Sequence, residues 1–435
     1  MLTTPPRGQG CAPDQLAGPT DRDRRQGEGP ATGALLRPPP GSIAVGRARM
    51  VMILGALIAL GPLTMDVYLP ALPRIGDEFS VPSSVSQLTL TATLIGLALG
   101  QLIVGPISDA FGRRRPLLVG IVLLIAASGV CAVAPSIVVL GVGRGAQGLG
   151  AAASMVVTVA VVGDLFAEST AAKVMSRLML VLGVVPILAP SAGAAVLVYG
   201  TWRGIFVVLI AIGGALLVMA AMMLPETLPQ ESRREMSMRA IATTYQRLLA
   251  DARFVSVVLA GGLGMSALFV YIAGASFVLQ ERFGLTQQTF ALAFSAGALA
   301  LITASQFNIV LLRCFSPQAI MMWSLAAATL SSAVFAVLME LHYGGLVGFV
   351  APVAAVMAAM GLVIPNAPAI ALSIHPEAAG TAAALLGATQ CGIGAVIAPV
   401  VGLMGNDAVT MAAAMTAGSA IALAALAIAR CDRSS

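Results

Sequence analysis

Two charged residues lie well inside long apolar stretches of this 435-residue chain. Asp66 lies in VMILGALIALGPLTMDVYLP, and Arg144 lies in GVGRGAQGLGAAASM. A charge surrounded by hydrocarbon is costly and marks either a polar pathway or a paired ion. A carboxylate in a cavity can bind and release a proton as its access to water changes, and a guanidinium nearby tunes that exchange. We therefore interpret Asp66 and Arg144 as a proton-coupling site; the alternative is a structural salt bridge between two helices.

The composition indicates which elements must position these residues. Hydrophobic residues make up 58% of the chain and charged residues 10%, with a mean hydropathy of +0.94. Soluble domains contain about 25% charged residues, whereas here apolar segments of about 20 residues, long enough to cross a bilayer as helices, recur throughout. The sequence predicts an all-α membrane protein with twelve transmembrane helices. The predicted spans are 50–70, 86–108, 116–134, 137–162, 175–198, 203–224, 254–278, 288–312, 318–339, 345–372, 380–403 and 408–429.

The largest polar interruption, residues 225–253, separates a six-helix half at 50–224 from a second half at 254–429. Placing both termini and this central loop in the cytoplasm puts nearly all loop arginines on one side, as the positive-inside rule requires. Residues 1–46 are rich in Pro, Gly and Arg and predict a disordered cytoplasmic tail, or an over-extended reading frame that truly starts at Met50 or Met52. Residues 430–435 form a short second tail.

The two halves share a short sequence pattern that indicates an internal repeat. Gly183, Ala189-Pro190 and Gly193 in the fifth span recur 209 residues later as Gly392, Ala398-Pro399 and Gly402. Parallel six-helix repeats with a substrate site between them are a transporter architecture.

Several motifs resemble a known family. TMDVYLPALP in the first span is similar to the first-helix signature of the Bcr/CflA drug-resistance transporters, a branch of the major facilitator superfamily of twelve-helix drug:proton antiporters. GPISDAFGRRRP at 105–116 resembles the superfamily's loop 2–3 motif, and RGAQGLG at 144–150 resembles its fourth-span motif. GVVPILAPSAG at 183–193 resembles the antiporter motif of the fifth span. The resemblance implies the major facilitator fold, and it covers the N-terminal half more specifically than the C-terminal half.

The resemblance assigns roles to particular residues. Independently of the resemblance, Gln147 follows Arg144 by one helical turn, and we expect Gln147 and Tyr68 in the polar cluster around Asp66 and Arg144. The loop 2–3 motif is expected to latch the cytoplasmic side, with Asp109 facing a neighbouring helix N-terminus. Its residues are Gly105, Asp109, Gly112, Arg113 and Arg114, and Ala110 departs from the pattern where a basic residue is usual. A plain topology signal is the alternative reading of these arginines.

The antiporter motif supplies Gly183, Pro186, Pro190 and Gly193. Such residues permit close helix packing and a bend, so ordinary packing is the alternative to a role in antiport.

The substrate site is predicted from a scarcity of polar side chains in the spans. The candidate cavity residues are Met155, Tyr271, Gln306, Asn366 and Gln390. A largely apolar cavity with one acid suits lipophilic, neutral or cationic compounds. We expect a proton-coupled multidrug exporter in the bacterial cytoplasmic membrane that works as a monomer. The alternatives are a proton-coupled transporter of one metabolite on the same fold and, from another class, a non-transporting receptor or scaffold.

Other functional classes lack support in the sequence. No Walker loop, zinc helix or nucleophile elbow occurs, so we expect no enzyme activity and no cofactor, with the proton gradient as the energy source. The five cysteines have neither metal nor disulfide spacing, so no metal site is predicted. The net charge of +5 comes from loop arginines and does not indicate a nucleic-acid partner.

Overall fold

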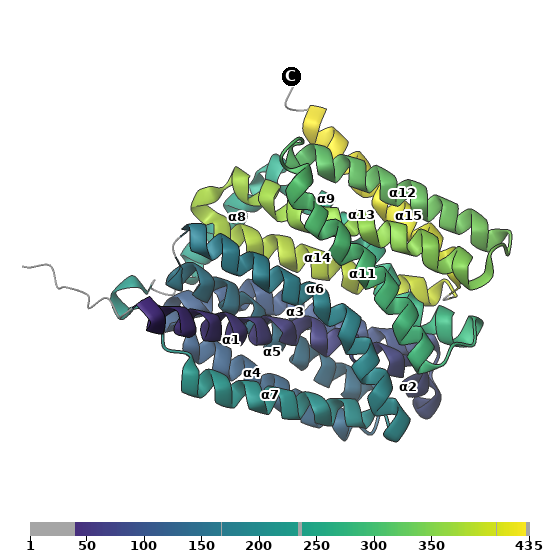
Figure 1. Ribbon diagram of the computed structural model, residues 1–435, viewed down its shortest axis with the longest axis horizontal. Helices are drawn as coiled ribbons and strands as arrows, with labels where there is room; N and C mark the ends of the chain where they lie inside the picture. The colour runs from purple at the N-terminus through teal and green to yellow at the C-terminus, as the bar shows by residue number, and fades with distance from the viewer. Residues whose placement is uncertain (1–39, 167, 234–236, 406, 432–435) are drawn as a thin grey trace, which may run out of the picture. The chain divides into compact units, whose positions relative to one another are not determined.

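The computed structural model describes residues 40–166, 168–233, 237–405 and 407–431. Every regular element in this part of the chain is a helix, and twelve helical stretches are long and apolar enough to cross a membrane (Figure 1). The predicted all-α membrane fold is therefore confirmed. The first 39 residues and 432–435, which belong to the two predicted tails, lie outside the described residues.

The helices fall into two sequence halves joined by α8 (Met238–Ala250). The first half comprises α1 (Pro40–Asp66), α2 (Leu72–Phe79), α3 (Ser83–Phe111), α4 (Arg114–Ala132), α5 (Ile137–Leu165), α6 (Glu168–Tyr199) and α7 (Arg203–Met223). The second comprises α9 (Ala252–Gly264), α10 (Ser266–Phe277), α11 (Gln287–Leu311), α12 (Pro317–Glu340), α13 (Gly345–Ile374), α14 (Ala379–Leu403) and α15 (Ala408–Cys431).

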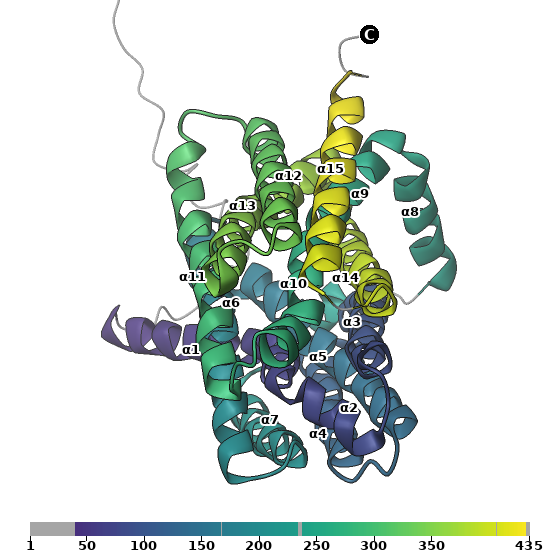
Figure 2. The same cartoon turned by 90° about the vertical axis from the view of Figure 1, so that its right-hand side faces the viewer.

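Residues 48–435 form one compact unit in which the halves meet along two seams. Helix α3 packs against α14, and α6 packs against α11, as Figure 2 shows. We call the end of the bundle that carries α8 and the α3–α4 connection the α8 end, and the opposite end, with α2, the α2 end (Figure 1).

The first span differs from its prediction at both ends. Helix α1 begins at Pro40, so residues 40–46 are helical rather than disordered. Proline is well tolerated in the first turn of a helix, where its missing N–H would have no partner. At the other end the helix stops at Asp66, and a 3₁₀ turn, Leu69–Ala71, leads into α2. Pro70 and Pro73 cannot donate backbone hydrogen bonds, which explains why the chain breaks there.

The seventh span is interrupted as well. The sequence predicts one helix over 254–278, whereas the structure has α9 and α10 separated at Met265, followed by a wide π turn at Val278–Arg282. Three glycines at 261, 262 and 264 precede the break. Glycine lowers helix stability by about 1 kcal/mol per residue, so the span is weakest where it breaks.

Helix α8 lies in the segment 225–253, for which the sequence predicts only a loop between the two halves. Ile241, Tyr245 and Leu248 recur at helical spacing, and Leu248 is buried. The tyrosine hydroxyl donates to the carbonyl of Leu102 in α3 at 3.0 Å. This face attaches α8 to the bundle.

Candidate coupling site and inter-half cavity

Asp66 is the last residue of α1 and is only 4% exposed. Among the described residues, no hydrogen bond or ion pair involves its carboxylate. The position follows from the sequence: α1 is apolar up to this residue, and the chain turns away at the following prolines. A buried carboxylate without a fixed partner is therefore placed at a helix break inside the first half.

Arg144 of α5 is fully buried and contacts the same end of α1. Its Nη1 donates to the carbonyl of Thr64 at 3.0 Å and to Gln147 Oε1 at 2.8 Å. The guanidinium lies 4.4 Å from the centre of the Tyr68 ring, a cation–π geometry. Its Nε and Nη2 have no hydrogen-bond partner in the described part of the chain.

The structure therefore brings Arg144, Gln147 and Tyr68 together but does not pair Arg144 with Asp66. The interhelical salt bridge considered above is absent among the described residues. The guanidinium instead contacts the backbone two residues before Asp66 and the ring two residues after it. Contacts with the Thr64 carbonyl, Gln147 and the Tyr68 ring hold the guanidinium instead, which explains the difference.

The polar cluster extends into the neighbouring helices. Gln147 Nε2 donates to Ser128 Oγ of α4 at 2.6 Å, and the Tyr68 hydroxyl lies 2.9 Å from Thr89 Oγ1 of α3. Buried polar side chains that satisfy one another in this way fix a single arrangement.

The antiporter motif in α6 lies directly against this site. A Cβ atom at Gly193 would fall 2.0 Å from the carbonyl oxygen of Val67, the residue after Asp66. Only glycine permits so close an approach of α6 to the end of α1. On the other side, Ser295 of α11 donates to the carbonyl of Ile187 at 2.8 Å, and Gly183 faces the side chain of Ile302. Pro186 and Pro190 lie inside α6 between these contacts. The motif helix thus touches both the coupling site and the second half.

A cavity of about 600 Å³ lies between the halves at the α8 end. It is lined by Gln101, Gly105, Pro106, Ser108, Asp109, Arg113, Met155, Val156, Val159, Ala160, Leu228, Tyr245, Glu377, Ala378, Ala379, Gly380, Thr381, Ala383 and Ala384. Its walls come from α3 and α5 on one side and the first turns of α14 on the other. Met155 connects it to α1, because its Sδ packs where a Cβ of Gly61 would lie.

Of the five residues predicted to line a substrate cavity, only Met155 lines this one. Tyr271 is instead stacked on Phe294 with ring centres 4.8 Å apart. Asn366 is buried and donates to Asn308 Oδ1 at 2.7 Å. Gln306 is exposed on α11, and Gln390 is half-buried on α14 outside this lining. Composition identified these side chains as polar but could not tell which face of its helix each occupies.

The residues of the loop 2–3 motif form a charged network at the mouth of this cavity. Arg113 pairs with Asp109, and its Nε donates to Asp164 Oδ2, at the end of α5, at 2.9 Å. Its Nη1 also donates to Ser108 Oγ at 2.9 Å. Gly112 has φ +91°, a backbone conformation that favours glycine. Gly105 lines the cavity, and Arg114 begins α4.

Glu226 is a carboxylate that accepts hydrogen bonds from a helix N-terminus. Its oxygens accept from the amides of Arg113 at 2.8 Å and Arg114 at 3.3 Å, at the start of α4. Helix N-termini favour anions. Burial alone would raise the pKa of Glu226, but hydrogen bonds from these amides and that of Leu228 hold the pKa below its usual value. Asp109 pairs with Arg113 of its own loop and lines the cavity, whose opposite wall contains the first turn of α14.

The α2 end is closed by hydrogen bonds between the halves. Gln87 Nε2 of α3 donates to the carbonyl of Ala273 at 3.0 Å, and Ser276 Oγ donates to that of Leu69 at 2.7 Å. Arg74 Nη2 reaches Gln287 Oε1 at 3.3 Å. The two halves are thus joined by polar contacts at one end and separated by a cavity at the other.

Residues 52–399 match the family model described as Major Facilitator Superfamily. The chain belongs to this superfamily. It is 36% identical over 375 residues to the "Uncharacterized MFS-type transporter YdgK" of Bacillus subtilis, covering 85% of this chain and 92% of that protein. It is 28% identical to the "Bicyclomycin resistance protein homolog" of Haemophilus influenzae, covering 82% and 89%. The resemblance to Bcr/CflA-type transporters is therefore confirmed.

A solved structure of the xylose transporter XylE from E. coli, in a partially occluded inward open conformation, shares the fold. The TM-score is 0.69 at 15% identity, covering 86% of this chain and 96% of XylE. Because the chain belongs to the major facilitator superfamily and has twelve candidate spanning helices among its described residues, it is a multi-pass membrane transporter of small molecules.

Sequence reasoning missed three charged residues that the structure places at the α8 end: Asp164, Glu226 and Glu377. Each lies at the end of a span, where the positive-inside rule counts arginines and gives acids little weight. A search for acids at span ends facing the Arg113–Arg115 cluster would have found the first two.

Proposed function

We propose that this protein is a proton-coupled antiporter that exports lipophilic, drug-like compounds across the bacterial cytoplasmic membrane. It would work as a monomer without a cofactor, with both termini in the cytoplasm. The observation that carries the proposal is the buried, unpaired Asp66 at the broken end of α1, held against the antiporter-motif helix through Gly193 and Val67.

Asp66 suits proton exchange for a physical reason. A buried carboxylate without a cation beside it is accommodated most readily as the neutral acid, since an unpaired buried charge is costly. Release of the proton then requires a rearrangement that brings water or a cation to the carboxylate. Arg144 is a suitable cation, because it contacts the backbone two residues before Asp66 and its Nε and Nη2 have no hydrogen-bond partner in the described part of the chain. Exchange of the proton would thereby be coupled to a change of conformation.

The drug specificity is supported by the relatives' names and by the cavity. The bicyclomycin resistance homolog covers most of this chain, and about half of the residues that line the cavity are Ala, Val, Leu, Pro or Met. Such a surface favours apolar substrates over sugars, which need many hydrogen-bonding partners. The carboxylate of Asp109 at its mouth would also admit cationic compounds.

In relatives the loop 2–3 motif latches the cytoplasmic side, and Asp109 faces the first turn of α14 across the cavity here. Closing the cavity would bring the two together.

The proposal is tested with Asp66→Asn, which keeps the shape of the side chain but fixes it as neutral. A growth-inhibition screen of overexpressing cells first identifies an exported compound. We expect Asp66→Asn to reduce gradient-driven efflux of that compound from proteoliposomes to the level of passive leak, while binding of a neutral lipophilic compound persists. Addition of the compound to purified wild-type protein should release protons at controlled pH, and the variant should release none.

Asp77→Asn is the matched control, because Asp77 is an exposed carboxylate on α2. It should pump and release protons as the wild type does. Proton release and uphill efflux that survive in Asp66→Asn would show that Asp66 does not carry the exchanged proton. Uphill transport of a single metabolite, with no protection against any toxic compound, would favour the metabolite carrier instead.

A further inference from the structure

His375, at the end of α13, is held between two carboxylates at the α8 end. Its Nε2 lies 2.9 Å from Asp251 Oδ2, and its Nδ1 lies 3.1 Å from Glu377 Oε1. The imidazole side chain is 13% exposed and packs edge-on against Phe254, with ring centres 5.6 Å apart. Neither the coupling site nor the cavity accounts for this arrangement.

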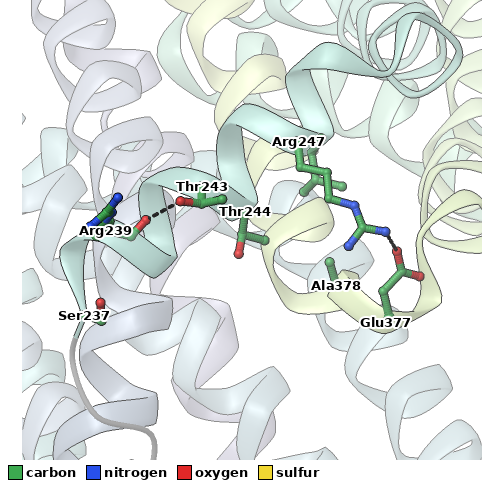
Figure 3. Close-up of a pocket in the computed structure, with 8 residues that line it drawn as sticks. Ser237, Arg239, Thr243, Thr244, Arg247, Glu377 and Ala378 are labelled. Atoms are coloured by element: carbon green, nitrogen blue, oxygen red, sulfur yellow. Dashed lines mark hydrogen bonds and ion pairs between the residues drawn. The ribbon is translucent and has the colours of Figure 1, made fainter.

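Both carboxylates are already fixed by other donors. Asp251 caps α9, accepting from the amides of Arg253 at 2.9 Å and Phe254 at 3.3 Å. Burial would raise the pKa of Asp251, but these hydrogen bonds and the one with His375 hold it below its usual value. Glu377 accepts from Arg247 Nη2 of α8 at 3.0 Å, the ion pair drawn in Figure 3. Both partners of the imidazole are therefore charged acceptors.

This geometry decides the charge of the ring. A neutral imidazole donates from one nitrogen and presents a lone pair at the other. With a carboxylate oxygen at each nitrogen, the neutral ring would set a lone pair against an anion, whereas the imidazolium donates to both. Histidine is the side chain that ordinarily changes charge between pH 5 and 8.

We propose that His375 is a second proton-binding site, on the α8 end, whose protonated form clamps α8 and α9 to the start of α14. The clamp consists of Arg247, Asp251, His375 and Glu377. Glu377 lies in the turn Pro376–Ala378 that leads into α14, whose first turns line the cavity opposite Asp109. Because α8 is also bonded to α3 through Tyr245, the clamp links both halves at the mouth of the cavity.

The charged groups around the ring are few. From α8 the group is Arg247, which lines with Glu377 a hollow of about 470 Å³ beneath that helix (Figure 3). The start of α9 contributes two charged groups, its capping residue Asp251 and the exposed Arg253. The turn before α14 contributes Glu377. The first turns of α14, residues 379–384, carry no titratable side chain. Loss of the proton from His375 therefore leaves one of the two carboxylates facing a lone pair instead of a donor, and the clamp loses one of its charge-assisted hydrogen bonds.

Hydrogen exchange tests the proposal on the full-length protein in detergent, independently of transport. After correction for the intrinsic pH dependence of exchange, we expect the protection of residues 376–384 to fall about tenfold between pH 6 and pH 8, the effect of losing a charge-assisted hydrogen bond. His375→Gln should show the low protection at both pH values. His375→Arg, which stays positively charged, should show high protection at both.

The chain offers a matched control, since its only other histidine is His342. His342→Gln, in the α12–α13 connection, should keep the wild-type pH dependence. The inference is overturned if protection in the wild type is the same at pH 6 and pH 8, or if the pH dependence persists in His375→Gln. The proposal goes beyond drug:proton antiport and stands or falls without Asp66.

Discussion

At the scale of single residues, Glu226 has the most backbone partners of any carboxylate at the cavity mouth. It accepts from the amides of Arg113, Arg114 and Leu228, and Arg233 lies 3.9 Å away. Its pKa in the folded protein is lower than its ordinary value of 4.5. A lowered pKa means that the stabilisation is present at neutral pH and is lost as the pH falls through the folded-state pKa.

We therefore expect Glu226→Gln to lower the free energy of unfolding at pH 7 by about 1 kcal/mol, at the low end for a charge-assisted bond because the side chain is 29% exposed. The deficit should shrink as the pH falls below 4.5 and through the lowered folded-state pKa of the carboxylate. Thermal unfolding in detergent across this pH range measures it.

Glu231→Gln is the control for this prediction, because Glu231 is an exposed carboxylate of the same connection. It should unfold like the wild type at every pH. An equal effect of the two substitutions, or a deficit in Glu226→Gln that does not change with pH, would contradict the prediction. Either result would show that hydrogen bonds from the start of α4 to the Glu226 carboxylate do not stabilise the protein.

The site residues that the sequence predicted most readily were the charged residues inside apolar spans. Asp66 and Arg144 stand out because charges are rare inside apolar spans, and the structure buries both. That they would not pair could not be predicted, since pairing depends on where α1 ends relative to α5. Glu226 and Glu377 could not be singled out in the sequence, because acidic residues are common near the ends of membrane spans.

At the scale of helices, the contact between α6 and the end of α1 depends on one glycine. A Cβ at Gly193 would lie 2.0 Å from a backbone oxygen that cannot rotate away. We expect Gly193→Ala to push the helices apart, to destabilise the protein by about 1–3 kcal/mol as overpacking does, and to abolish uphill efflux. Apparent melting temperature and gradient-driven transport measure the two effects.

Gly214→Ala in α7 is the matched control, since nothing lies within 4 Å of the added methyl group there. Because alanine favours helix over glycine, this variant should be as stable as the wild type or slightly more stable. Full transport activity in Gly193→Ala would mean that the α6–α1 contact plays no part in coupling.

The presence of each spanning helix could be predicted, because an apolar segment long enough to cross a bilayer must satisfy its backbone hydrogen bonds as a helix. All twelve predicted spans correspond to helices. Helix interruptions were harder to predict. The prolines after Asp66 and the three glycines before Met265 are visible in the sequence, but such residues also occur in unbroken helices here, such as Pro106 in α3. The outcome depends on whether neighbouring helices supply replacement contacts. Helix α8 was overlooked because its apolar face is short.

At the scale of the whole molecule, the two ends of the bundle differ in a way that predicts alternating access. Polar contacts such as Gln87 to Ala273 join the halves at the α2 end, whereas a cavity of about 600 Å³ separates Gly105 from Ala383 at the α8 end. If transport exchanges these arrangements, the α2 contacts must break whenever the cavity closes. The loop arginines predict that the α8 end is cytoplasmic, and with that orientation the structure would be open inward.

Thiol cross-linking in a cysteine-free background tests this exchange. The pair Gln87→Cys with Ala273→Cys should react with a short bifunctional reagent in the resting protein and stop efflux until a reductant restores it. The pair Gly105→Cys with Ala383→Cys should react only during turnover, when the cavity closes. Ala383→Cys alone should be labelled by an impermeant reagent in inside-out vesicles but not in intact cells. Labelling in intact cells would reverse the orientation, and efflux that continues while the α2 end is cross-linked would exclude a cycle in which that end must open.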